Sequence, residues 1–374
     1  MTMIDIVSAL DSLAHQHPAL ALIVELGLKS FLVLICGFIA VWLLAKASAS
    51  SKNFAWRMVF SILFALPFLQ GLIPDMQIAV HSSHPENASL ISGTFSNPAL
   101  QSVLYSTLFL GYFLVSAFLL LRLVVSLHRS SLIVRSASAI ESARIHSLLN
   151  KAVSRNGSTH PISLLVSDFV TSPVTMGVIT HKIIFPSAVH SWSDNLVEQV
   201  IGHELGHIQR SDWVQQFVGR LVVCFFWFNP LALIAANRMS LEAEKASDDF
   251  AIDDTGCRIS YAENLLGLAQ LLKQKTNGSL ALGFFGGQHV LLQRIAYILS
   301  EDKHQHRIDR DSCLPGVLVA VLLAMPISAA NVTLEQPSLA ATTKPLLFAV
   351  DYFPNKSAES TLFQRELESH STRF

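Results

Sequence analysis

Two histidines and a glutamate stand at a spacing that suits metal chemistry, in the segment His203-Glu204-Leu205-Gly206-His207. Positions i and i+4 of an α-helix share one face, so both imidazoles could bind a single zinc ion. Glu204, which lies between them, could then act as general base toward a water on that metal. Together these residues form the minimal set for metal-assisted hydrolysis of a peptide bond.

The residues around the motif predict the helix that it needs. Ser193 or Asp194 is a candidate N-cap, and apolar residues follow at helical spacing as far as Arg210. The alternative interpretation is a pair of surface histidines on a helix that binds no metal.

Two histidines leave a catalytic zinc one protein ligand short, because such sites usually have three ligands and one open position. The downstream candidates are Asp212, Glu242, Glu244, Asp248 and Asp249. Glu244 is favoured because it lies four residues before Asp248, so the two share a helix face, whereas Glu242 points elsewhere. Asp248 is predicted to orient a ligand histidine through its second ring nitrogen. The alternative for Asp248 is a solvated carboxylate.

The apolar stretch 214–236 separates His207 from Glu244 and resembles a single membrane span. A single crossing would place the ligands on opposite sides of the bilayer. Asn229-Pro230 instead predicts a new helix, since Asn is a good N-cap and Pro suits the first helical position. We therefore predict an apolar helical hairpin over 213–250 that enters or lies against the bilayer, with a buried hairpin of a soluble domain as the alternative.

Composition places the chain among membrane proteins. Of its 374 residues 51% are hydrophobic and 14% charged, and the mean hydropathy is +0.45. This is too apolar for an ordinary soluble enzyme and is typical of a polytopic, mainly α membrane protein. The net charge of −1 indicates no direct nucleic-acid partner.

Apolar runs predict three transmembrane helices in the N-terminal third, at Leu22–Ala45, Phe54–Ile73 and Val103–Leu127, and a shorter fourth at Leu314–Ala330. Lysines and arginines flank the first loop and follow the third run, whereas 74–101 contains neither. By the positive-inside rule the N-terminus and the C-terminal tail lie outside and the central part is cytoplasmic.

The resulting domain organisation has four parts. A membrane domain (1–127) precedes a cytoplasmic zinc metalloprotease domain (128–312), a fourth transmembrane helix (313–331) and a short external tail (332–374). Within the second part we predict a helix and a small antiparallel sheet ahead of the motif helix, at Ile140–Arg155, Pro161–Val166, Val174–Ile179 and Lys182–Phe185.

An ordered set of motifs across roughly residues 20–330 resembles the BlaR/MecR family of integral-membrane zinc metallopeptidases. Besides the apolar runs, it consists of Ser172-Pro-Val-Thr-Met-Gly177 with Ile183-Ile-Phe-Pro186, His203-Glu-Leu-Gly-His207-Ile-Gln-Arg210-Ser-Asp212, Trp227-Phe-Asn-Pro230 and Glu244-Lys-Ala-Ser-Asp248. The resemblance implies a gluzincin-like α+β site in which His203, His207 and Glu244 bind zinc and Glu204 is the catalytic base.

One departure from the family concerns the C-terminus. The antibiotic receptors of this family carry a penicillin-binding sensor domain with an S-x-x-K motif after the fourth helix. Here 331–374 contains no S-x-x-K. The expectation is therefore a member without that sensor domain.

The resemblance implies a regulatory protease of the bacterial inner membrane that cleaves itself or a cytoplasmic transcriptional repressor. Two alternatives stay open: a constitutive quality-control protease of the membrane, and a non-catalytic signalling scaffold with a structural zinc. Retention of Glu204 argues against the scaffold, because a structural site has no use for a base. His181 and His190 are weak candidates for stabilising the oxyanion.

Overall fold

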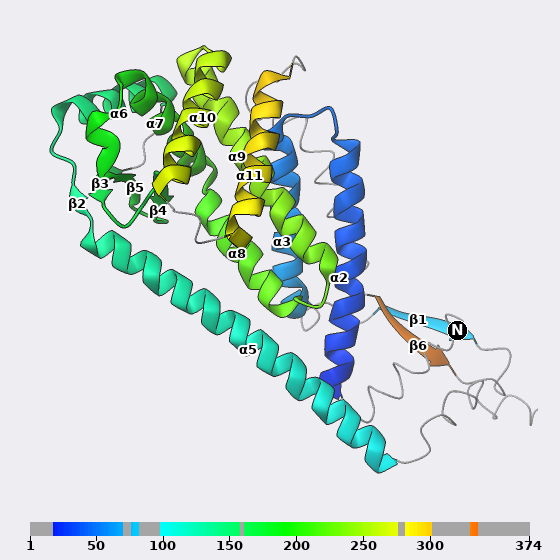
Figure 1. The fold of residues 1–374 in the computed structure, drawn as a ribbon. Helices are drawn as coiled ribbons and strands as arrows, with labels where there is room; N and C mark the ends of the chain where they lie inside the picture. Colours follow the sequence, from blue (N-terminus) through cyan, green and yellow to red (C-terminus); the bar gives the residue numbers. More distant parts are fainter. Residues whose placement is uncertain are drawn as a thin grey trace, which may run out of the picture. The chain divides into compact units, whose positions relative to one another are not determined.

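The computed structural model describes residues 18–69, 76–81, 98–157, 161–275, 281–300 and 330–335. It divides into two compact units, one of residues 1–11, 77–94 and 332–374, and one of residues 12–76 and 95–331. A two-stranded sheet pairs β1 (Met76–His81) with β6 (Ala330–Glu335). All other described elements belong to the second unit, which contains the candidate site (Figure 1).

Three long apolar helices form where the first three membrane spans are predicted: α2 (Pro18–Leu43), α3 (Ala49–Leu69) and α5 (Pro98–Ser136). Of these, α2 and residues Ser102–Ser136 of α5 are long and apolar enough to cross a membrane. α5 turns large apolar side chains outward, among them Phe113 and Phe118. Such a helix suits lipid better than water, and α2 and α5 are candidate membrane spans.

The prediction of four spans is thus supported for two. α3 forms a helix but does not match the composition of a membrane span within the part of the chain that the structure describes. One face of α3 is buried and packs against α8 and α9, with four large side chains that are at most 1% exposed: Trp56, Phe60, Leu63 and Leu66. Most of the fourth predicted span, 314–329, lies outside the described residues, and its last residue, Ala330, begins β6.

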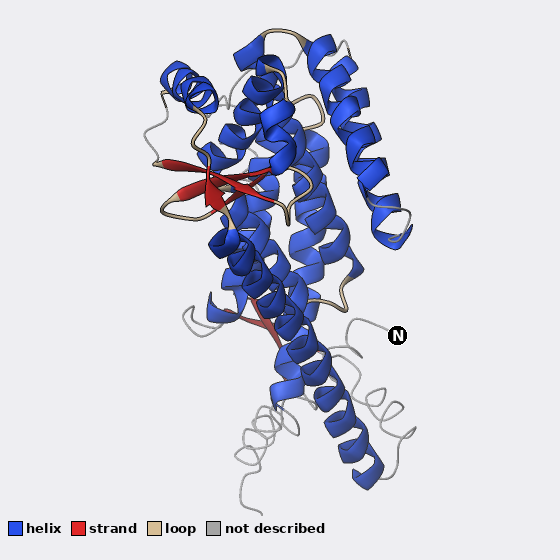
Figure 2. Ribbon diagram, turned by 60° about the vertical axis from the view of Figure 1, so that its left-hand side comes forward, coloured by secondary structure: helices blue, strands red, loops and turns tan. Residues whose placement is uncertain are grey.

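The predicted small sheet is present, but its strand directions differ from the prediction. It contains β2 (Ser138–Ala139), β3 (Ile162–Ser167), β4 (Val174–Met176) and β5 (His181–Pro186), in the order β2-β3-β5-β4. Figure 2 draws the strands in red among the helices. β3 and β5 are parallel, and the other two pairs are antiparallel. The prediction of an antiparallel sheet was therefore wrong for this pair. The chain reverses twice through β4, which brings β5 back in the direction of β3.

The motif lies on α7 (Asp194–Arg210), which packs with α6 (Ala143–Asn156) and the sheet around one hydrophobic core. Ser193 is the N-cap, and its hydroxyl accepts a hydrogen bond from the backbone N–H of Leu196. The short 3₁₀ helix η2 (Ser187–Ser191) leads into it from β5. The helix therefore begins at one of the two predicted capping residues.

Beyond α7 the chain forms the predicted hairpin, α8 (Asp212–Phe225) followed by α9 (Pro230–Thr255). Asn229 caps α9 by accepting a hydrogen bond from the N–H of Leu231, and its own amide donates to Ser30 on α2 over 2.9 Å. Two further helices follow, α10 (Arg258–Lys275) and α11 (Ala281–Leu299). The prediction that Asn229-Pro230 starts a new helix is confirmed.

Two glycines of α7 let α9 approach closely enough for Glu244 to reach the histidines. A Cβ atom on Gly206 would lie 3.2 Å from the Cα atom of Ser247, and one on Gly202 would lie 3.3 Å from the Cα atom of Ala251. Both contacts are with backbone atoms, which cannot move without moving α9. The glycines therefore set the separation of the two helices that carry the site.

Replacing Gly206 with Val is expected to push α9 away from α7. The free energy of unfolding should fall by about 1–3 kcal/mol, as for other overpacked cores, and metal binding should weaken. Thermal melting of the purified protein in detergent measures the first effect. Gly111→Val on α5 is the matched control, because a Cβ there meets nothing within 4 Å. Equal melting temperatures for the two variants would contradict this account of the helix approach.

Candidate metal centre

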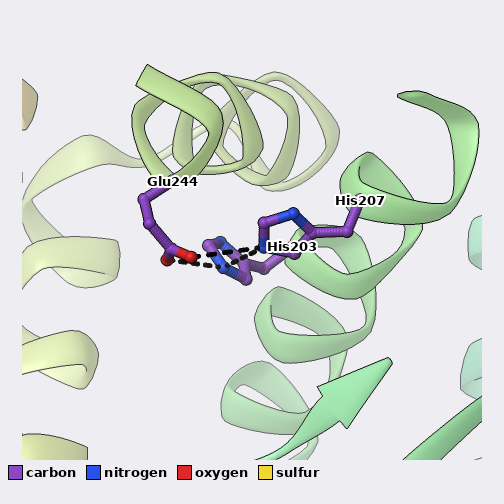
Figure 3. Close-up of side chains that lie close together, drawn as sticks. All are labelled: His203, His207 and Glu244. Atoms are coloured by element: carbon purple, nitrogen blue, oxygen red, sulfur yellow. Dashed lines mark hydrogen bonds and ion pairs between the residues drawn. The ribbon is translucent and has the colours of Figure 1, made fainter. Parts of the chain in front are cut away.

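Three potential ligand atoms converge between α7 and α9. One atom each of His203, His207 and Glu244 lies within 4.8 Å of the others, and the three side chains point toward one another (Figure 3). The two Nε2 atoms are 3.2 Å apart, and they lie 3.5 Å (His203) and 3.7 Å (His207) from carboxylate oxygens of Glu244. Ligand atoms of a tetrahedral zinc, each about 2.0–2.1 Å from the metal, are roughly 3.4 Å apart. The donor set and its spacing therefore fit one such ion.

His207 is held from behind by a carboxylate. Its Nδ1 lies 2.7 Å from Oδ2 of Asp212, and the same oxygen accepts a hydrogen bond from Arg210 over 2.7 Å. Burial alone would raise the pKa of Asp212, but the interactions with His207 and Arg210 lower it below its usual value. Asp212, one of the alternative ligands, thus lies behind a histidine and not among the three ligand atoms. Ser211 has a left-handed backbone (φ 54°) and ends α7. The turn of the chain at this residue places Asp212 beside His207.

His203 has a corresponding support on its own Nδ1. Oδ1 of Asp248 lies 3.2 Å away and the hydroxyl of Tyr261 lies 3.1 Å away. Tyr261 also donates a hydrogen bond of 2.7 Å to Asp248, which is fully buried. Asp248 therefore has the position from which it was predicted to orient a ligand histidine.

The electrostatics of the centre favour positive charge between the two helices. Burial by itself lowers the pKa of His203, but hydrogen bonds to Asp248 and Glu244 outweigh it and raise that pKa to about 9. The pKa of Glu244 lies well below its usual value, because its hydrogen bond to His203 and the charge of Arg294 outweigh the effect of burial. An environment that stabilises a proton on His203 would also stabilise a divalent cation.

Glu204 lies on the same turn of α7 but does not join the cluster of ligand atoms. Its side chain is buried, and its Oε2 accepts a hydrogen bond of 2.6 Å from the hydroxyl of Thr175 on β4. This contact gives the carboxylate one fixed partner and leaves its other oxygen for a water or a substrate proton.

A cavity of about 1470 Å³ opens onto the centre. Its walls include β4, His181 and Glu204, together with apolar parts of α5, α8, α10 and α11 that contribute Leu123, Leu127, Phe217, Leu265, Val290 and Leu291. This volume is ample for a peptide segment. Of the two histidines considered for the oxyanion, only His181 lines the cavity, whereas His190 is exposed on η2.

The structure brings together the predicted residues His203, His207, Glu244, Glu204 and Asp248. Of the other candidates, Glu242 pairs with Lys245 at 2.9 Å, and Asp249 accepts a hydrogen bond from Tyr297. Sequence reasoning did not identify Thr175, Tyr261 or Arg294. A signal did exist for Arg294, because it is the single Lys, Arg, Asp or Glu in the sequence of α11. A lone charge in an apolar helix often marks a functional site.

Apolar helices that enclose a His, His, Glu centre with an adjacent acid are features of a membrane metallopeptidase. The family model described as BlaR1 peptidase M56 matches residues 27–298. The chain belongs to this family, as its resemblance in sequence implied.

Two curated relatives extend this finding. The chain is 24% identical over 216 residues to the methicillin resistance mecR1 protein of Staphylococcus aureus, which is 56% of this chain and 37% of the relative. It is 26% identical over 220 residues to the regulatory protein BlaR1 of Bacillus licheniformis, which is 58% of this chain and 36% of the relative. The matches thus cover little more than a third of the length of these relatives.

Proposed function

We propose that this chain is a zinc endopeptidase of the bacterial inner membrane that cuts a protein substrate in a regulatory pathway. The observation that carries the proposal is the convergence of His203, His207 and Glu244 at zinc-like spacing, with Glu204 beside them at the wall of the cavity. The family supports a metallopeptidase, and the similarity to the regulatory protein BlaR1 of Bacillus licheniformis supports a regulatory role.

In this proposal His203, His207 and Glu244 hold the zinc ion. Bound there, the metal supplies Lewis-acid chemistry, which polarises a carbonyl and acidifies water. Glu204 takes the proton of the attacking water at its carboxylate and passes it to the departing amine. Thr175 orients Glu204 by its hydrogen bond to Oε2. Asp212 and Asp248 keep the Nε2 atoms of the two histidines directed at the metal.

The topology of the proposal follows the distribution of basic residues. The N-terminus and the C-terminal tail lie outside and the metal centre faces the cytoplasm. This orientation needs three crossings before the metal centre and one after it. In the proposal α3 therefore crosses between α2 and α5, inside the core that it forms with α8 and α9, and 313–331 crosses after α11. The substrate is then a cytoplasmic protein or the chain itself, and the proposed partner is a transcriptional repressor.

A comparison of protein N-termini across the proteome tests this function. Cells that express the native chain are compared with cells that express Glu204→Ala at a matched level. A few new termini that depend on Glu204 are expected, and one of them should lie in a repressor or in the chain itself. Many unrelated termini would favour a quality-control protease. The comparison is repeated under varied growth conditions, so that an external signal that activates the protease is not missed. If no terminus differs under any of them, the proteolytic proposal fails and the non-catalytic scaffold with a structural zinc replaces it.

A further inference from the structure

We propose that Arg294 is a positioning residue of the metal centre, which ties one metal ligand and the support of another to α11. The inference rests on the proposed zinc site, and it concerns a residue 50 positions beyond Glu244 in the chain. The planar guanidinium of Arg294 contacts two carboxylates of α9 at once, Glu244 and Asp248.

The contacts with Asp248 are bidentate. Nε of Arg294 donates to Oδ2 over 2.9 Å, and a terminal nitrogen donates to Oδ1 over 2.6 Å. Paired, charge-assisted bonds of this kind fix the plane of a carboxylate as well as its charge. Asp248 in turn holds Nδ1 of His203 at 3.2 Å, so the orientation of this ligand depends on Arg294 through one intermediate.

The remaining terminal nitrogen of Arg294 lies 2.9 Å from Oε2 of Glu244. Oε1 of Glu244 faces His207 instead, at 3.7 Å from its Nε2. Arg294 therefore limits the rotation of the Glu244 carboxylate and sets which oxygen faces each histidine. Two of the three proposed ligands are positioned by one guanidinium, directly or through Asp248.

Charge balance supports the same role. Asp248 is fully buried and the Arg294 side chain is only 13% exposed, so each would be costly to bury without the other.

The two histidines show a matching pattern, because each is backed by an aspartate that is paired with an arginine. On the His207 side these are Asp212 and Arg210, which follow the motif directly in the chain. On the His203 side the arginine comes from a separate helix, α11, and this makes the metal centre dependent on the docking of that helix.

A neighbouring contact of α11 provides a matched control. Tyr297, on the turn after Arg294, donates a hydrogen bond of 2.8 Å to Asp249, and Lys245 lies over its ring. Tyr297 therefore helps to dock α11 on α9, but neither Asp249 nor Lys245 belongs to the ligand cluster. Tyr297→Phe weakens docking without removing a contact to the metal centre.

The experiment measures the zinc affinity of the full chain in detergent by competition with a chromophoric chelator, alongside thermal melting without metal. Arg294→Gln is expected to weaken zinc binding about 10–100-fold, as loss of an outer contact to metal ligands does. Arg294→Lys should fall between Gln and the native residue, since an ammonium cannot form the bidentate pair. Tyr297→Phe should lower the melting temperature and leave zinc affinity unchanged.

Two results would overturn the inference: native zinc affinity in Arg294→Gln, or equal loss of affinity in Arg294→Gln and Tyr297→Phe, which would indicate only that α11 must be docked. If the native chain itself binds no zinc, the proposed function fails with it. If the native chain binds zinc and Arg294→Gln binds it equally well, only the role of Arg294 is lost.

Discussion

Glu244→Ala is expected to abolish stoichiometric zinc binding while the protein stays folded and inserted in the membrane. Glu244 is the one proposed ligand that comes from α9, and without it the two histidines of α7 form an incomplete site. The loss of affinity should exceed the roughly 10–100-fold effect of an outer contact. Metal content of the purified protein, measured by mass spectrometry, gives the result directly.

Glu242→Ala is the matched control for this variant. Glu242 lies on the same helix, is buried, and pairs with Lys245 at 2.9 Å outside the ligand cluster. Its replacement should leave one zinc ion bound per chain. Full zinc occupancy in Glu244→Ala, with its helical circular dichroism preserved, would show that the third ligand is another residue.

Glu204→Gln is expected to reduce the rate of peptide cleavage by about 10²–10⁴-fold with no change in zinc content. The amide keeps the size of the side chain and can still accept the hydrogen bond of Thr175, but it cannot take a proton from water. The rate is measured on an unfolded protein such as labelled casein, with zinc content determined on the same preparation.

Thr175→Val separates the base from its support. The variant keeps Glu204 and removes only the hydroxyl that donates to Oε2, so activity should fall by less than in Glu204→Gln, again with zinc retained.

If Glu204→Gln cleaves at the native rate, Glu204 is not the base. If it loses zinc together with activity, the carboxylate instead supports the metal site.

The parts of the site that were predictable from sequence are those encoded by local spacing. His203 and His207 share a face because the i, i+4 relation holds in any α-helix. Asn229-Pro230 starts α9 because capping acts within a few residues. The prediction of Glu244 as third ligand followed from these two facts, since a helix that returns toward the motif presents Glu244 and Asp248 on one face.

The strand directions and the burial of α3 were beyond such reasoning. β-prone runs indicate strands but not their partners, and β3 pairs with β5 rather than with the next strand in the sequence. The apolar run 54–73 suggested a span, yet Trp56 and Phe60 of α3 fill a core that α8 and α9 complete. An apolar helix face can pack against lipid or against other helices. Sequence spacing shows that the face is apolar but does not specify which of these surfaces it contacts.

The sequence by itself thus determined the family, the candidate metal-binding motif, its helix and the hairpin that carries the proposed third ligand, because each depends on neighbouring residues along the chain. The tertiary structure decided which residues support that centre. Thr175 meets Glu204 from 29 positions away, Arg294 meets Asp248 from 46, and Tyr261 meets His203 from 58. Contacts over such separations exist only after the helices have packed, and the glycines of α7 control how closely they pack.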